Sequence, residues 1–181
     1  NRRGPMTQTR FTDTHRSDTA IIGIGLYPFG RHPGVSPVQM GAEATRKALA
    51  DAGVDWGDLD FAYGGSYGIH TGTGEGTTAD SMVRQLGLTG LPFVNVSNGC
   101  ATAGSAISMA YNTIAAGRGR LGLVVGFDKH LRGAFNVDPA LFGLEPWYGA
   151  SGLMLTTQFI AMKIQRYLQQ YDLDPGILAA V

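Results

Sequence analysis

The chain has 181 residues, of which 44% are apolar, and its 14 basic and 14 acidic side chains balance, whereas nucleic-acid-binding proteins usually carry a basic excess. The balanced charge leads us to expect no nucleic-acid partner. No apolar run reaches the length of a bilayer span, so we also expect no membrane span. The length fits one domain or one and a half, and the single cysteine excludes an intrachain disulfide and fits a reducing, cytoplasmic compartment.

The first part of the chain alternates apolar extended runs with helical signals. Residues 18–25 form a short apolar run that predicts a first strand. The string Ser36-Pro37-Val38-Gln39 predicts a helix start, with serine as the N-cap, proline at the first position and glutamine three residues after the cap. This helix should run through Ala50 and stop at Gly53. Residues 59–64 predict a second strand, which leads into a glycine-rich loop.

The middle of the chain continues the same alternation. We predict a short helix at 80–86, a strand at 91–96, a long helix at 101–116 and a strand at 121–127. Strands that alternate with helices indicate an α/β layered fold with a mostly parallel sheet. The last strand is apolar throughout, as expected for a strand that is covered on both faces.

The long helix at 101–116 is rich in small residues, which predicts close contacts with its neighbours on most sides. The predicted core stripe of this helix consists of Ala103, Ile107, Ala110, Tyr111 and Ile114. Beyond the last strand, residues 129–152 look irregular and contain Trp147 and Tyr148. These two rings either line an acyl or sterol pocket or pack the segment onto the core. A long helix at 153–171 and a short one from Asp174 follow.

Cys100 lies between the strand at 91–96 and the long helix, so its thiol is placed at the start of a helix. The first N–H groups of a helix are unpaired and the helix dipole is positive there, which stabilises a thiolate and favours nucleophilic chemistry. Gly99 and Ala101 leave room for a bulky substrate to approach the sulfur. The alternative is that Cys100 is a buried small apolar residue without a chemical role.

Other motifs in the chain point to no tightly bound cofactor or metal. Gly23-Ile24-Gly25 follows the first predicted strand, but no helix opens after it as a dinucleotide-binding loop requires. The glycine-rich loop after residue 64 lacks the following Lys-Ser or Lys-Thr of a phosphate-binding loop. The four histidines do not pair at metal-ligand spacing, and one cysteine cannot complete a zinc cluster. We therefore predict no metal site and no tightly bound cofactor, and these motifs identify no cofactor-binding residues.

The segment from Asn95 to Lys129 resembles the nucleophile segment of the thiolase superfamily. The resemblance rests on a small-residue helix that opens with Cys100 to Ala106 and on the strand Leu123 to Lys129, which closes in glycine, an aromatic residue, an acid and lysine. The later strings Gly149 to Gly152 and Tyr167 to Leu173 are most similar to the sterol-carrier or lipid-transfer type of thiolase.

This resemblance implies a domain organisation. Residues 1–17 would be a flexible N-terminus and residues 18–129 the thiolase-like N-terminal α/β core. Residues 130–181 would be a loop-domain segment, where the family has its coenzyme A contacts, although individual residues cannot be matched to that role. The C-terminal half of a thiolase would be absent from this chain, and we expect a homo-oligomer or a hetero-complex.

The resemblance also implies a mechanism in which Cys100 attacks an acyl-CoA thioester and holds the acyl group covalently. The reaction would be 3-ketoacyl-CoA cleavage or condensation in lipid or sterol metabolism, with coenzyme A as substrate. In the family a histidine, a second cysteine and a glycine N–H from the C-terminal half complete the site. Two alternatives stay open: a retro-aldolase subunit for steroid side-chain CoA esters that acts with a partner protein, and a non-catalytic lipid-binding subunit.

Overall fold

The computed structural model describes residues 19–66, 78–130, 133 and 135–180. The chain forms two compact units, and the boundary between them in the sequence lies between Lys129 and His130. The predicted flexible N-terminus at 1–17 and the part of the glycine-rich loop at 67–77 lie outside the described residues. In the part of the chain that the structure describes, none of the helices is long and apolar enough to cross a membrane.

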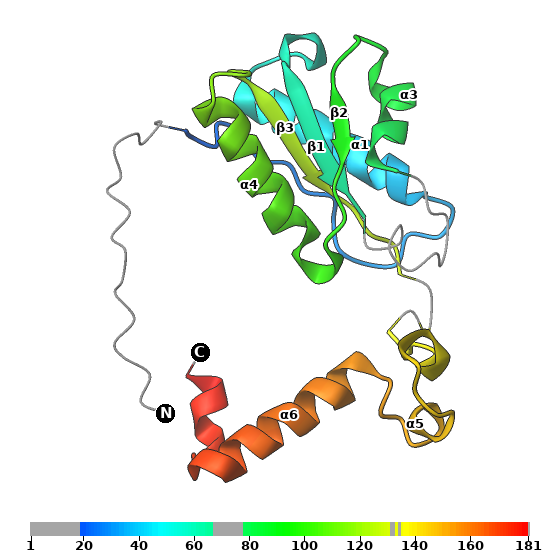
Figure 1. Ribbon diagram of the computed structural model, residues 1–181. Coiled ribbons are helices and arrows are strands. Elements are labelled where there is room, and N and C mark those ends of the chain that lie inside the picture. Colours follow the sequence, from blue (N-terminus) through cyan, green and yellow to red (C-terminus); the bar gives the residue numbers. More distant parts are fainter. Residues whose placement is uncertain (1–18, 67–77, 131–132, 134, 181) are drawn as a thin grey trace. The chain divides into compact units, whose positions relative to one another are not determined.

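The first unit is built on a three-stranded parallel sheet, as the sequence predicts. Its strands are β1 (Phe61–Gly65), β2 (Phe93–Asn95) and β3 (Gly122–Gly126), in the order β2-β1-β3. Ala62 pairs with Phe93 on one side and with Leu123 on the other. The helices α1 (Pro37–Ala52) and α4 (Thr102–Ala115) lie on opposite faces of this sheet (Figure 1). The fold is therefore the predicted α/β layered class.

The core lies between α1, the sheet and the helical turn η2 (Ala79–Met82), which leads into α3 (Val83–Leu86). Helix α1 begins with the predicted capping box and ends at Gly53, whose φ of 67° is left-handed. A Cβ added at Gly41 would lie 2.6 Å from the Met82 sulfur, so α1 and η2 pack without room for a side chain there. The buried core residues are Val38, Ala42, Trp56, Ala62, Ala79, Met82, Leu123, Val125 and Phe127.

The pairing of β1 with β3 places a large residue opposite a small one. Phe61 and Gly122 are register partners, and a Cβ added at Gly122 would lie 2.1 Å from the Phe61 ring. The same ring lies 2.7 Å from the position of a Cβ at Gly119. The aromatic ring therefore fills the space above both glycines, and it is itself buried.

The predicted first strand at 18–25 is wrong for its described part, because residues 19–25 belong to no sheet. This segment lies along α1 instead: the Ile24 N–H donates to an Asp51 carboxylate oxygen at 2.9 Å, and the Lys47 ammonium donates to the Leu26 carbonyl at 3.2 Å. Cβ atoms at Gly23 and Gly25 would collide with carbonyl oxygens of α1. The two glycines thus let an extended backbone approach a helix, and the isoleucines of the segment stay exposed.

The prediction that α4 is buried on most sides is also wrong in the described structure. Only Thr102 and Ala106 of this helix are buried, and the Tyr63 hydroxyl bonds to Thr113 Oγ1 at 2.7 Å. Ile107 and Tyr111, from the predicted core stripe, are 52% and 41% exposed. The sheet covers one face of α4. Small residues would allow another element to pack closely against the remaining faces, but in the described structure those faces are exposed.

Asp60 ties the start of β1 to the start of β3. Its carboxylate accepts hydrogen bonds from the Arg120 N–H at 2.7 Å and the Leu121 N–H at 3.1 Å, and its own N–H donates to the Leu121 carbonyl. These two hydrogen bonds from backbone N–H groups hold the pKa of Asp60 below its ordinary value of 3.8, and the bond from Arg120 has the larger effect. The contribution of Asp60 to folding stability is therefore fully present above that ordinary value and is lost as the pH falls through the lower folded-state value.

We expect Asp60→Asn to lower the melting temperature at pH 7, because the amide is a weaker acceptor than the carboxylate. The difference between the variant and the parent chain should shrink as the pH falls below 3.8 and through the lower pKa that Asp60 has in the folded chain. Circular dichroism melts across this pH range measure it. A difference that stays constant over the whole range would show that the charge of Asp60 does not support the β1–β3 pairing.

The second unit consists of short helical turns and one long helix. These are η4 (Pro139–Phe142), α5 (Trp147–Ala150), α6 (Thr156–Tyr171) and η5 (Pro175–Ala179). An isolated antiparallel bridge joins Asn136 to Leu155. Leu168 is the buried residue of α6.

Candidate functional site

The carboxyl ends of the three strands carry a group of polar residues. Ser66 directly follows β1, Asn95 ends β2, and Asp128 and Lys129 lie two and three positions after the end of β3. Because the strands are parallel, their carboxyl ends meet at one edge of the sheet, which is where open α/β sheets bind ligands. Cys100 lies between β2 and α4 in the chain, and the N-terminal end of α4 lies at this edge of the sheet (Figure 1).

A sharp turn presents Cys100. Gly99 has a left-handed φ of 52°, which glycine adopts without strain, and the 3-10 turn η3 (Gly99–Ala101) runs directly into α4. The side chain of Cys100 is exposed, which excludes the alternative of a buried small apolar residue. The structure therefore places Cys100 where the sequence predicts it, at the start of a helix.

Two hydroxyl groups of α4 fix this turn. Thr102 Oγ1 donates to the Gly99 carbonyl at 2.7 Å and accepts from the Asn98 N–H at 2.9 Å, so one side chain closes a ring across the turn. The Asn98 side-chain amide donates to Ser105 Oγ at 2.9 Å. Thr102 is buried although it is polar, and both of its hydrogen-bonding capacities are used.

The end of β1 packs directly against the same turn. A Cβ added at Gly65 would lie 2.1 Å from the Val96 carbonyl oxygen and 2.5 Å from Thr102 Cγ2. No side chain fits at position 65 without moving the backbone before Cys100. The placement of the thiol therefore depends on a glycine that lies 35 positions earlier in the sequence.

Further hydrogen bonds join the strand ends to one another and to α1. Ser66 Oγ donates to an Asp128 carboxylate oxygen at 2.8 Å, which links β1 to β3. The Lys129 ammonium donates to the Val35 carbonyl at 2.6 Å, next to the N-cap of α1. Sequence reasoning missed the role of Ser66, because its partner is 62 residues away and no local pattern links the two residues.

Asn95 holds the element that precedes β2. Its side-chain oxygen accepts from the Ala79 N–H at 2.7 Å, and its amide donates to an Asp80 carboxylate oxygen at 3.0 Å. Hydrogen bonds from the Thr78 and Asn95 side chains lower the pKa of Asp80 from its ordinary value. This asparagine therefore anchors η2 to the strand that leads to Cys100.

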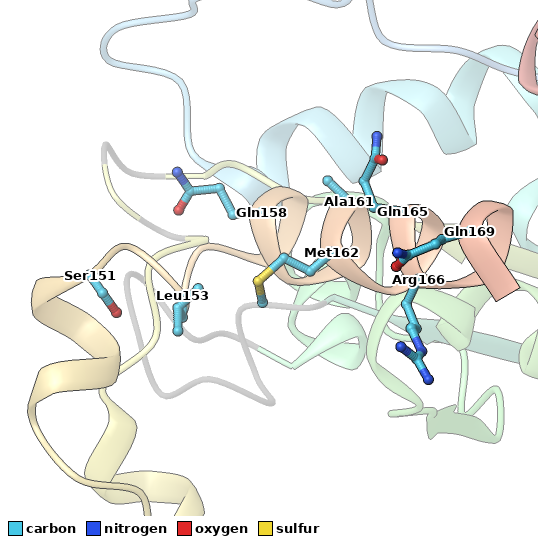
Figure 2. A pocket seen from close by; sticks show the side chains of 8 residues that line it. All are labelled: Ser151, Leu153, Gln158, Ala161, Met162, Gln165, Arg166 and Gln169. Atoms are coloured by element: carbon cyan, nitrogen blue, oxygen red, sulfur yellow. The ribbon is translucent and has the colours of Figure 1, made fainter. Parts of the chain in front are cut away.

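The second unit contains an open pocket of about 740 Å³ along one face of α6 (Figure 2). Met162 and Leu153 supply apolar surface, and Arg166 supplies a guanidinium group. The lining residues are Ser151, Leu153, Gln158, Ala161, Met162, Gln165, Arg166 and Gln169. The pocket thus combines an apolar floor with amide groups and one positive charge, a set that suits an anionic ligand with an apolar portion.

Trp147 and Tyr148, for which the sequence leaves two interpretations, do not line this pocket. Their rings stack on each other with centroids 3.9 Å apart, and Trp147 is exposed. Among the described residues, no group of histidine, cysteine, aspartate or glutamate side chains could hold a metal ion.

Comparison with known proteins identifies the architecture. The family model "Thiolase, N-terminal domain" matches residues 19–132. The chain is 27% identical over 173 residues to Sterol carrier protein 2 of Gallus gallus, which covers 89% of this chain and 31% of that protein. It is 27% identical over 166 residues to an Acetyl-CoA acetyltransferase of Methanothermobacter thermautotrophicus, which covers 91% of this chain and 43% of that protein.

A solved structure of an Ltp2-ChsH2(DUF35) aldolase superposes with a TM-score of 0.61 at 27% identity, which covers 84% of this chain and 38% of that one. This chain spans less than half the length of each of these three proteins. The family match covers the whole parallel sheet, both flanking helices and the turn that bears Cys100. The chain belongs to the thiolase family and contains its N-terminal domain.

Proposed function

We propose that this chain is part of a thiolase-type acyltransferase that acts on acyl-CoA thioesters and that Cys100 is its nucleophile. The observation that carries the proposal is the exposed thiol on a sharp turn before α4, at the carboxyl edge of a parallel sheet in a thiolase domain. The acetyltransferase relative supports the acyl-CoA substrate class. The Sterol carrier protein 2 relative supports a role in lipid or sterol metabolism, for which we propose a cytoplasmic location.

In the proposed reaction, the Cys100 thiolate attacks the thioester carbonyl carbon and forms a new carbon–sulfur bond. The carbonyl electron pair moves to oxygen, and the resulting oxyanion collapses as the bond to the coenzyme A sulfur breaks. Coenzyme A leaves as a thiolate and takes a proton, and the acyl group stays on Cys100. In condensation, the second step transfers that group to the carbanion at C2 of a second acyl-CoA. In the cleavage of a 3-ketoacyl-CoA, the thiolate instead attacks the 3-keto carbon, the bond between C2 and C3 breaks, and acetyl-CoA leaves as its carbanion and takes a proton. The coenzyme A thiol then attacks the acyl-cysteine, which releases the shortened acyl-CoA and returns the Cys100 thiol.

Incubation with acetyl-CoA tests the first step. At about pH 9 a free thiol ionises in water without a dedicated base, so this half-reaction does not depend on residues outside the chain. Intact mass spectrometry should show one added acetyl group, and peptide mapping should locate it on Cys100. A chain that iodoacetamide alkylates at Cys100 but acetyl-CoA leaves unmodified would contradict the proposal.

A second candidate is a retro-aldolase subunit that cleaves a CoA ester together with a partner protein. The observation that favours it is the similarity to the Ltp2-ChsH2(DUF35) aldolase structure over 84% of this chain. This candidate does not need an acyl-cysteine. Cleavage of a steroid side-chain CoA ester that persists after loss of Cys100, together with copurification of a partner, would favour it over the acyltransferase.

We further propose that the pocket on α6 holds the phosphate groups of coenzyme A through Arg166. A guanidinium group binds phosphate through charge-assisted hydrogen bonds, and the neighbouring glutamine amides add donors. Lys163 lies on the same helix but its ammonium lies 4.2 Å above the Phe159 ring and outside the pocket lining. The two cations therefore form a matched pair with equal charge and different positions.

We expect Arg166→Gln to weaken coenzyme A binding about fivefold, which corresponds to roughly 1 kcal/mol for an accessible charge-assisted contact. Lys163→Gln removes the same charge and should leave the affinity nearly unchanged. Isothermal titration calorimetry of each variant with coenzyme A measures the effect. Equal losses in both variants would indicate that net charge, and not the pocket, attracts the ligand.

Self-association through β2 is the remaining part of the proposal. This strand is at an edge of the sheet, it has three residues, and Val94 on it is 44% exposed. An exposed apolar strand edge favours pairing with another chain. We expect a dimer or a larger species in sedimentation velocity at micromolar concentration, and Val94→Lys should shift it toward monomer. A single monomeric species for the parent chain would contradict this.

A further inference from the structure

We infer that Thr102 is a positioning residue for acyl transfer: its hydroxyl fixes the peptide between Gly99 and Cys100 so that the Cys100 N–H stands ready as an oxyanion donor. The inference rests on the proposed function, because an oxyanion forms only when a thioester is attacked. It deepens that function by assigning the alignment of the donor to one side chain of this chain.

Two hydrogen bonds fix the direction of the Gly99 carbonyl. This oxygen accepts two hydrogen bonds from the same residue, one from the Thr102 N–H and one from Thr102 Oγ1 at 2.7 Å. Both donors belong to the first residue of α4, so the carbonyl is directed into the start of that helix.

Peptide geometry then sets the direction of the Cys100 N–H. The peptide unit is planar and trans, so the N–H of Cys100 points opposite to the carbonyl of Gly99. Because that carbonyl is directed into α4, the N–H of Cys100 is directed away from the helix body. A donor aimed at the developing oxyanion stabilises the transition state of acyl transfer.

The hydroxyl is needed because Gly99 has no conformational preference of its own. Gly99 adopts a φ of 52°, and glycine populates both signs of φ about equally. Thr102 Oγ1 spans this residue: it accepts from the Asn98 N–H at 2.9 Å on one side and donates to the Gly99 carbonyl on the other. Without the hydroxyl, the peptide after Gly99 keeps one bond, from the Thr102 N–H, and gains freedom to rotate.

The two branches of Thr102 make different contacts, which allows them to be tested separately. The hydroxyl bonds to the turn, whereas the methyl group Cγ2 packs where a Cβ of Gly65 would be, at the end of β1. Thr102→Val keeps the shape of the side chain and removes the hydroxyl. Thr102→Ser keeps the hydroxyl and removes the methyl group.

The test compares two reactions of Cys100 in the full chain. Acetylation by acetyl-CoA passes through an oxyanion, whereas alkylation by iodoacetamide displaces iodide from a saturated carbon and forms none. We expect Thr102→Val to lower the ratio of the acetylation rate to the alkylation rate at least about tenfold, because loss of one oxyanion donor typically costs 10²–10³. Thr102→Ser should keep the parent ratio and should lower the melting temperature through lost packing.

The inference is wrong if the ratio of acetylation rate to alkylation rate in Thr102→Val equals that of the parent chain. It is also wrong if Thr102→Ser lowers this ratio as much as Thr102→Val does. A parent chain that is alkylated but not acetylated contradicts the proposed function itself. The positioning role is then decided by ¹⁵N relaxation: the Cys100 amide should be as rigid as α4 in the parent and in Thr102→Ser, and mobile in Thr102→Val. Equal rigidity in all three chains would reject the role of the hydroxyl.

Discussion

Cys100→Ser should abolish covalent acetylation by acetyl-CoA, with a loss of at least about a hundredfold, since a serine hydroxyl without an activating base is a far weaker nucleophile than a thiolate. The substitution is small, and the side chain is exposed, so the fold should be retained. Intact mass spectrometry after a fixed incubation measures the adduct, and a melting curve of the variant confirms that the fold is intact.

A relocated thiol provides the matched control for this variant. The double substitution Cys100→Ser with Ser97→Cys places an exposed thiol three residues earlier, before the turn at Gly99. Iodoacetamide should alkylate this thiol, whereas acetyl-CoA should acetylate it much more slowly than Cys100. Equal acetylation at both positions would mean that the helix start confers no advantage. Retained CoA-ester cleavage in Cys100→Ser would favour the aldolase candidate.

Gly65→Ala should destabilise the first unit by about 1–3 kcal/mol or more, the usual cost of overpacking. Its Cβ would lie 2.1 Å from the Val96 carbonyl oxygen, and a backbone atom cannot move aside as a flexible side chain does. The shift should also displace the turn before Cys100 and slow acetylation. Urea denaturation followed by circular dichroism measures the free energy of unfolding.

The control for this prediction is Gly104→Ala in α4. A Cβ at Gly104 meets no atom within 4 Å, so the added methyl group causes no collision. Alanine has a higher helix propensity than glycine, by about 1 kcal/mol in a helix interior, and the variant should be slightly more stable than the parent. A Gly65→Ala chain with unchanged stability, or a Gly104→Ala chain that is destabilised, would show that the packing around α4 differs from the structure described above.

Local patterns in the sequence predicted the elements whose causes are local. The capping string at Ser36 and the stop at Gly53 predicted α1, and the apolar runs predicted the three parallel strands. The position of Cys100 before α4 followed from the same patterns. These signals work because capping and strand formation depend on residues within a few positions of one another.

Features that depend on distant partners were not predictable in this way. The small residues of α4 indicate that close packing is possible, but the exposure of Ile107 depends on what lies opposite the helix. The apolar pattern at 19–25 indicates an extended backbone and cannot distinguish a strand from a segment that pairs with Asp51 and Lys47 of α1. The bond from Ser66 to Asp128 spans 62 residues and leaves no local signal.

The pairing of Phe61 with Gly122 limits how this domain can vary through evolution or in a designed library. Any side chain at position 122 would enter the volume of the Phe61 ring, so position 61 must become smaller before position 122 can become larger. If position 122 is enlarged first, the resulting single variant is overpacked, and β1 and β3 cannot keep their register in it. The two positions therefore behave as one unit of variation, and a library that randomises them independently will contain mostly chains that fail to close this sheet.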